Sequence, residues 1–152
     1  MGAGDPSRRH VRIQVAVSDE RGRRVLPGLS RWLAQVAPAR ARGTVNVALV
    51  SDHRVRALNR QYRGVDRATD VLSFPSETAN DFLGDIVIAR GVARGQARAA
   101  GHDETTEIRV LALHGLLHLL GHDHERDAGA MARLERRLRK KGGLREGLIE
   151  RQ

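Results

Sequence analysis

The chain has 152 residues, enough for one domain with a substantial hydrophobic core, and it contains no cysteine. Disulfide bonds and thiolate metal sites are therefore excluded, so histidine must carry any metal chemistry. Lysine and arginine total 27 against 18 acidic residues, and the net charge of +9 favours a polyanionic partner with salt-dependent binding, although an arginine-rich composition alone would explain the same excess.

Two further classes of protein are disfavoured. With one tryptophan, one tyrosine and two phenylalanines, the chain has few aromatic residues for a base-stacking platform of the RRM type. No run approaches the 18 or more apolar residues that a membrane helix requires, and the first ten residues lack the apolar segment of a signal peptide. We therefore expect a cytoplasmic protein that has no membrane contact.

Strand and helix patterns alternate along the chain. Alternation of apolar and polar residues and short apolar runs predict strands, which are 11–17, 44–50, 70–74 and 85–89. Apolar positions with a period near 3.6 predict five helices. Three are expected at 29–36, 92–100 and 127–141. Another follows Ser51 and ends at Tyr62-Arg63-Gly64, and a long apolar one follows Asp103 and carries His114 and His118. This alternation indicates an α/β (α+β) fold with a single domain, in which a roughly four-stranded mixed sheet packs with about five helices.

Polar residues and glycines mark several helix ends. Ser51 can cap the second predicted helix, in which Val55, Leu58 and Tyr62 are the apolar positions. Asp103 can cap the long apolar helix. The last predicted helix is basic and amphipathic, and its inward positions are Met131, Leu134 and Leu138.

Three histidines lie within the eleven-residue run HGLLHLLGHDH at 114–124. His114 and His118 are four residues apart, so both imidazoles lie on one face of a helix and can bind one metal ion. Gly121 can adopt the left-handed conformation that ends helices, after which the chain can return with His124. Three neutral imidazoles with an open fourth position are the ligand set of a catalytic zinc, which lowers the pKa of its bound water to about 7.

The sequence thus predicts one Zn²⁺ per chain at the C-terminal end of the long buried helix. A lone histidine in an apolar helix is usually a core residue with a satisfied hydrogen bond, but two at this spacing would each need a buried partner. His122 can be a fourth ligand or a pocket residue. Asp123 can orient a ligand imidazole or simply close the turn.

The histidine spacing is also that of the metzincin zinc proteases. Those proteases carry a glutamate general base directly after the first histidine, where this chain has Gly115. Ordinary peptide cleavage is therefore disfavoured.

Arg63 stands at the predicted end of the second helix, between Tyr62 and Gly64. An arginine at such a junction can contact a scissile phosphate and offset the charge that develops in the transition state. Alternatively, it compensates the helix dipole and forms a surface ion pair.

Three segments together resemble the YbeY family of bacterial endoribonucleases: LNRQYRGVDRATDVLSFP at 58–75, LGDIVIA at 83–89 and the histidine run. The resemblance extends from about residue 10 to residue 140. It implies a zinc-dependent, single-strand-specific endoribonuclease that acts in 16S rRNA 3′-end maturation and ribosome quality control. RNA in ribosomal particles is then the partner, with ribosomal or GTPase proteins as further candidates.

The resemblance also implies site residues. His114, His118 and His124 match the zinc-binding histidines of the family, and Arg63 matches an arginine implicated in activity. Two positions depart from the family pattern. The family often has proline where this chain has Ala68, and often has tyrosine where this chain has His122. Residues 10–141 would form the single catalytic domain, with a flexible tail at 1–9 and a loosely held tail at 142–152.

Two alternatives to a metal-dependent endoribonuclease remain. The first is another zinc hydrolase of peptidase type, against which Gly115 argues. The second is a non-enzymatic, ribosome-associated RNA-binding module with a structural zinc, which would need His122 to complete the ligand shell.

Overall fold

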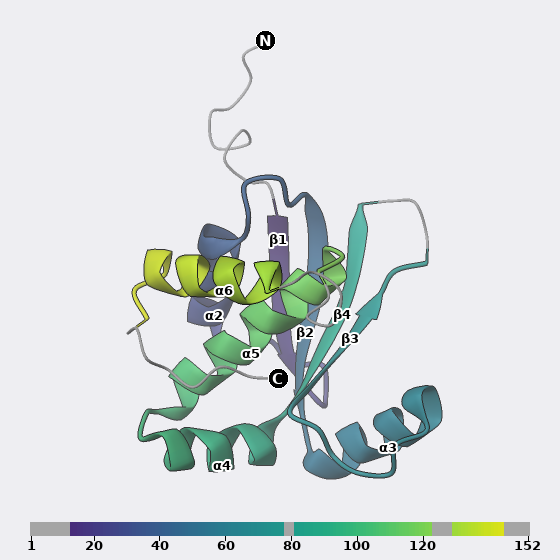
Figure 1. Cartoon of the computed structure of the whole chain (residues 1–152). Helices are drawn as coiled ribbons and strands as arrows, with labels where there is room; N and C mark the ends of the chain where they lie inside the picture. The colour runs from purple at the N-terminus through teal and green to yellow at the C-terminus, as the bar shows by residue number, and fades with distance from the viewer. Residues whose placement is uncertain (1–12, 78–80, 123–128, 145–152) are drawn as a thin grey trace.

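The computed structural model describes residues 13–77, 81–122 and 129–144. In chain order the elements of these residues are β1 (Ile13–Asp19), α2 (Pro27–Val36), β2 (Gly43–Val50), α3 (Asp52–Arg63), β3 (Val71–Pro75), β4 (Phe82–Ala89), α4 (Arg90–Ala100), α5 (Glu104–Leu119) and α6 (Ala130–Lys141) (Figure 1). The predicted fold class, a single domain with four strands and about five helices, is confirmed by these elements.

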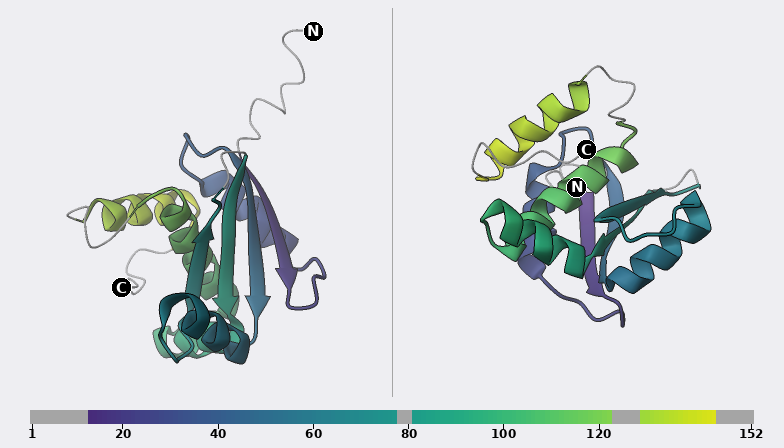
Figure 2. Two further views of the ribbon diagram at one scale, coloured as in Figure 1. Left: turned by 90° about the vertical axis from the view of Figure 1, so that its right-hand side faces the viewer. Right: turned by 60° about the horizontal axis from the view of Figure 1, so that its bottom comes forward.

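The four strands form one mixed sheet in the order β1-β2-β4-β3. β1, β2 and β4 are parallel, whereas β3 pairs antiparallel with β4 and lies at one edge of the sheet. α2 and α5 cover one face of the sheet, α6 packs on the outside of these two helices, and α3 lies against the other face near β3 (Figures 1 and 2). The β3 edge therefore has α5 on one side and α3 on the other.

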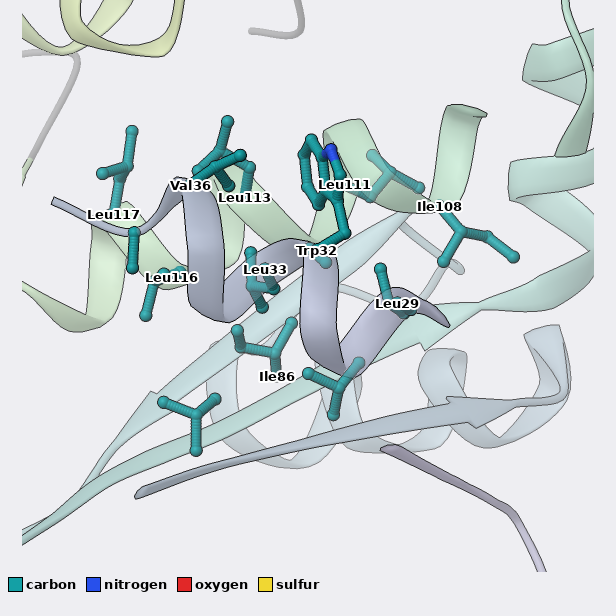
Figure 3. Close-up of a cluster of buried hydrophobic side chains, with 14 of the residues drawn as sticks. Leu29, Trp32, Leu33, Val36, Ile86, Ile108, Leu111, Leu113, Leu116 and Leu117 are labelled. Atoms are coloured by element: carbon teal, nitrogen blue, oxygen red, sulfur yellow. The ribbon is translucent and has the colours of Figure 1, made fainter. Parts of the chain in front are cut away.

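The main core lies between the sheet and the layer formed by α2 and α5 (Figure 3). Leu33 of α2, Ile86 of β4 and Leu116 of α5 are fully buried in it. α5 is buried on almost every side, since ten of its sixteen residues are buried. A helix that is apolar all round belongs in a protein interior, so a polar side chain on α5 needs a specific partner.

Helix capping confirms several predicted boundaries. The Ser51 hydroxyl accepts a hydrogen bond from Arg54 N at 3.1 Å and begins α3. Gly64, Gly101 and Gly121 follow α3, α4 and α5 with φ angles of 70°, 74° and 96°. This left-handed conformation is the one that glycine adopts without strain, so each of these helices ends close to where the sequence indicates.

Several element starts differ from the prediction, among them those of α6, α4 and β4. α6 begins at Ala130 and not at residue 127, because Gly129 before it has φ 86°, which a right-handed helix cannot continue through. α4 begins at Arg90, directly after β4 and without a turn. β4 begins at Phe82, earlier than predicted, because β2 and β3 both pair with this strand beyond its most apolar segment.

The position of Tyr62 differs from the prediction. Val55 in the same helix is fully buried, but Tyr62 in the last turn is 61% exposed. Helical periodicity identified the apolar face of α3 correctly. The sheet, however, covers only part of this helix, because α3 lies at the edge of the sheet (Figure 1). The Tyr62 ring instead lies edge-on to the ring of Phe74 in β3, with centroids 5.3 Å apart.

The first residues after α6 lie against the domain. Trp32 Nε1 donates a hydrogen bond to the carbonyl oxygen of Gly142 at 2.9 Å, and Leu144 packs against the core. The predicted tail at 1–9 falls outside the described residues, and of the predicted tail at 142–152 only residues 142–144 are described. Within the described residues, no helix is long and apolar enough to span a membrane.

We predict a measurable stabilisation from the cap of α5. Asp103 Oδ1 accepts a hydrogen bond from Thr106 N at 2.8 Å, and this bond lowers the pKa of Asp103. Asp103→Ala should lower the free energy of unfolding by about 1 kcal/mol at pH 7, whereas Asp103→Asn should retain most of the stability because asparagine caps comparably.

The same cap has a pH dependence. Because the pKa of Asp103 is lower in the folded state, the charge contributes stability above about pH 4 and loses it as the pH falls through the folded-state value. Denaturant titrations at pH 7 and pH 3 should therefore show the wild type losing any advantage over Asp103→Asn at the lower pH. Equal stability of wild type and Asp103→Ala at pH 7 would show that the cap contributes nothing.

Candidate active site

Two of the predicted metal ligands lie together at the end of α5. The Nε2 atoms of His114 and His118 are 3.1 Å apart, and the two rings meet edge to face with centroids 4.7 Å apart. This is the arrangement that the four-residue spacing predicts. His114 is buried and His118 is partly exposed, so the pair lies at the boundary between the core and solvent.

The geometry of the pair fits one zinc ion. Zn–N bonds of about 2.0–2.1 Å at a tetrahedral angle place two ligand nitrogens roughly 3.3 Å apart, close to the 3.1 Å observed here. Among residues 13–77, 81–122 and 129–144, no three histidine, cysteine or acidic side chains are placed to hold a metal. The predicted third ligand, His124, and its neighbour Asp123 lie outside these residues.

A buried acidic side chain supports the inner histidine from behind. His114 Nδ1 lies 2.6 Å from Glu135 Oε1, and Arg139 donates to Glu135 Oε2 at 2.9 Å. The sequence analysis missed both residues of α6. A signal was present, because Glu135 is a charged residue on the helix stripe defined by Met131 and Leu138.

The histidine pair opens into a cleft of about 1400 Å³. Its walls include strand β3 and the C-terminal end of α3, and His122 also lines it. Tyr62 and Arg63 line this cleft together with His114 and His118. The fold therefore brings the predicted arginine to the same cleft as the histidines, although the two segments are far apart in the sequence.

Arg63 is not engaged in the surface ion pair that the alternative interpretation requires. The carboxylate beside the end of α3 is Asp66, which pairs with Arg56 at 2.8 Å and with Arg60 at 4.0 Å. The hydrogen bond from Arg56 lowers the pKa of Asp66. Within the described part of the chain, Arg63 forms no ion pair and is exposed. Its guanidinium is therefore available to an anionic ligand in the cleft.

The structure gives a steric reason for glycine at position 115 that the sequence did not reveal. A Cβ atom at this position would lie 2.7 Å from Ile86 Cγ2 and 3.1 Å from the Ser73 hydroxyl. Ser73 also donates a hydrogen bond to the Gly115 carbonyl at 3.0 Å. Position 115 therefore faces the sheet at close range, and the glutamate of the zinc proteases has no space there.

Comparison with known proteins agrees with this architecture. The family model described as Endoribonuclease YbeY matches residues 13–143. The chain belongs to the YbeY family. An Endoribonuclease YbeY from Solibacter usitatus (strain Ellin6076) is 50% identical over 126 residues, covering 82% of this chain and 84% of the relative. One from Koribacter versatilis (strain Ellin345) is 50% identical over 124 residues, covering 81% of each.

The fold also resembles a solved structure. The solution structure of TM1509 from Thermotoga maritima has a TM-score of 0.56 to this chain at 26% sequence identity. The match covers 91% of this chain and 99% of the Thermotoga protein. The similarity thus extends over most of this chain.

The close contact at Gly115 leads to a stability prediction. Gly115→Ala should lower the free energy of unfolding, because overpacking costs about 1–3 kcal/mol and the higher helix propensity of alanine returns only about 1 kcal/mol. The β-branched Ile86 side chain cannot rotate its Cγ2 away cheaply. Denaturant titration of both proteins measures the difference.

Gly95 in α4 provides the matched control. Nothing lies within 4 Å of a Cβ at Gly95, so Gly95→Ala should raise the free energy of unfolding by up to about 1 kcal/mol. If Gly115→Ala stabilised the protein as much as Gly95→Ala does, the close approach of α5 to the sheet would not be a constraint.

Proposed function

We propose that this chain is a zinc-dependent endoribonuclease that cleaves single-stranded RNA during 16S rRNA 3′-end maturation and ribosome quality control in the cytoplasm. The observation that carries the proposal is the convergence of two imidazole Nε2 atoms in a cleft that also contains Arg63. The names of the YbeY relatives support the reaction, and the net charge of +9 favours a polyanionic substrate such as ribosomal RNA.

The metal would be held by His114, His118 and His124. When bound there, zinc supplies a Lewis acid that polarises a phosphoryl oxygen and makes water a stronger nucleophile at neutral pH. The imidazoles provide neutral nitrogen ligands, and three of them leave a coordination position open. His122 lines the cleft, where it can contact RNA or complete the ligand shell.

Arg63 would bind the phosphate at which cleavage occurs. Its planar guanidinium can donate two parallel hydrogen bonds to the non-bridging oxygens and remains charged at any physiological pH. The end of α3 fixes the backbone from which this side chain extends. A donor that is already in place stabilises the charge that develops in the transition state, which is the usual source of a large catalytic effect.

The cleft also offers a surface for an unpaired base. The ring of Tyr62 is mostly exposed and is supported edge-on by Phe74. Stacking of a base on an aromatic side chain contributes about 1–3 kcal/mol, and a base is free to stack in this way only when the strand is unpaired. We therefore assign Tyr62 to the recognition of single-stranded RNA.

The first prediction of this proposal concerns the metal. Purified protein should bind one zinc per chain, and His118→Ala should lose most of it, because one of the nitrogens that bind the ion is removed. His53→Ala removes an exposed histidine of α3 outside the cleft and should retain the metal. Elemental analysis after gel filtration measures the stoichiometry. Full zinc retention by His118→Ala would refute the assigned site.

Cobalt substitution separates a catalytic from a structural site. If three histidines leave an open position, the visible spectrum of the cobalt-substituted protein should change when inorganic phosphate is added. A spectrum that is insensitive to phosphate and that changes in His122→Ala would instead favour a closed site and the non-enzymatic module.

The second prediction separates catalysis from metal binding. Arg63→Ala should retain zinc and fold but cleave RNA about 10²–10³-fold more slowly, because a single preorganised donor accounts for about 2.7–4 kcal/mol. Arg63→Lys should recover part of the rate, since it retains the charge but not the two-point contact. Single-turnover cleavage of a labelled single-stranded RNA measures the rates.

Arg98 provides the control for Arg63. It is also an exposed arginine in the last turn of its helix, α4, but it does not line the cleft. Arg98→Ala should cleave RNA at close to the wild-type rate. If Arg63→Ala and Arg98→Ala behaved alike, Arg63 would be a charge at a helix end and no more.

A further inference from the structure

A charged pair is buried in α6 directly behind the histidine site. Glu135 is 3% exposed and Arg139 is 5% exposed, although both belong to ionised residue types. Glu135 Oε1 lies 2.6 Å from His114 Nδ1, and Arg139 donates to Glu135 Oε2 at 2.9 Å. Arg139 thus contacts Glu135, and Glu135 contacts the imidazole of His114, so these contacts connect α6 to α5.

Packing alone does not explain this pair. Met131 and Leu138 on the same face of α6 are apolar and buried. Removing two charges from water costs several kcal/mol per ion, and well-packed apolar residues in place of such a pair are often neutral or stabilising. The stability gained from packing therefore does not account for a carboxylate and a guanidinium at this position.

The contact determines which nitrogen of His114 carries the proton. An ionised carboxylate only accepts hydrogen bonds, so in the neutral ring Nδ1 must be the donor to Glu135. Nε2 of that ring then carries a lone pair. It is this Nε2 that lies 3.1 Å from Nε2 of His118. The proton is thus placed on the nitrogen facing α6, and the nitrogen facing the cleft is left able to bind a metal.

We propose that Glu135 is the positioning residue of the metal site, and that Arg139 in turn holds Glu135. This inference rests on the proposed zinc site. Glu135 fixes the tautomer and the rotation of the His114 ring and increases the basicity of its Nε2. Glu135 does not line the cleft and is almost fully buried, so it cannot touch RNA. Arg139 offsets the negative charge in the interior and directs the second carboxylate oxygen away from the imidazole.

This arrangement makes metal affinity depend on the Glu135 carboxylate that α6 places behind His114. Met131 at the start of α6 is fully buried. At the other end, Trp32 of α2 donates a hydrogen bond to the Gly142 carbonyl. Both ends of the helix are therefore held against the domain, and Glu135 lies between them. A ligand on α5 is oriented by a helix that supplies none of the predicted zinc ligands.

The test uses the full chain with the double substitution Glu135→Leu and Arg139→Met, which replaces the buried pair by apolar side chains. The metal-free variant should be as stable to denaturant as the wild type or more so. Its zinc Kd, measured by competition with a chromophoric chelator, should nevertheless be about 10–100-fold weaker. Glu135→Gln retains an acceptor for Nδ1–H without the charge, so its zinc Kd should lie between those of the wild type and the double variant.

A readout without metal tests the tautomer directly. In metal-free wild type, ¹⁵N chemical shifts of the neutral His114 ring should identify Nδ1 as the protonated nitrogen. The double variant should lose this preference. Leu138→Ala is the control for general damage to α6, because it removes a buried apolar side chain of the same helix. It should lower stability yet leave the zinc Kd and the His114 tautomer unchanged.

The outcomes separate this inference from the proposed function. If the wild type binds zinc and the double variant binds it equally well with Nδ1 still protonated, Glu135 has a structural role only and the positioning role is refuted. Equal losses of affinity in Leu138→Ala and the double variant would refute it as well. If the wild type binds no zinc, the metal site itself fails, and the positioning role fails with it.

Discussion

The close approach of α5 to the sheet is the constraint on which the site depends. Gly115 leaves no side chain between the helix and Ile86, and Ser73 of β3 hydrogen-bonds to the Gly115 carbonyl. The helix is thereby fixed against β3 and β4 at the turn that carries the two histidines. Without that contact, His114 and His118 would remain on one helix face, but their position relative to the cleft would not be determined.

Polar groups around this contact are arranged in two environments. On the buried side, His114 meets Glu135, which is held by Arg139, and each of these groups has a charged or polar partner. On the solvent side, the end of α3 presents Tyr62 and Arg63 to the cleft. In the proposed function, the buried groups orient the zinc ligands and the exposed groups bind an RNA strand. This division supports the proposed function, because catalysis needs both a rigid centre and an accessible substrate cleft.

Local sequence patterns predicted much of this molecule. The caps Ser51 and Asp103, the left-handed Gly121 and the pairing of His114 with His118 all depend on residues within four positions of each other. Such features are encoded by short-range geometry. The number of strands and helices followed from periodicity in the same way.

Features that depend on contacts between distant segments were predicted less well. Tyr62 matched the apolar period of α3, but its exposure is set by how far the sheet extends beneath the helix. Glu135 matters because α6 docks behind α5, which no local pattern specifies. Gly115 was interpreted as a missing catalytic glutamate, whereas the structure adds a steric reason for glycine at this position.

The measurement that tests the central claim most directly is cleavage of RNA by the zinc-loaded protein. The account predicts that a single-stranded RNA is cut and a duplex of the same sequence is not. A chelator should abolish cleavage, readdition of zinc should restore it, and an unfolded protein substrate should stay intact. Cleavage that survives complete removal of the metal, or chelator-sensitive cleavage of the protein substrate instead of RNA, would contradict the account.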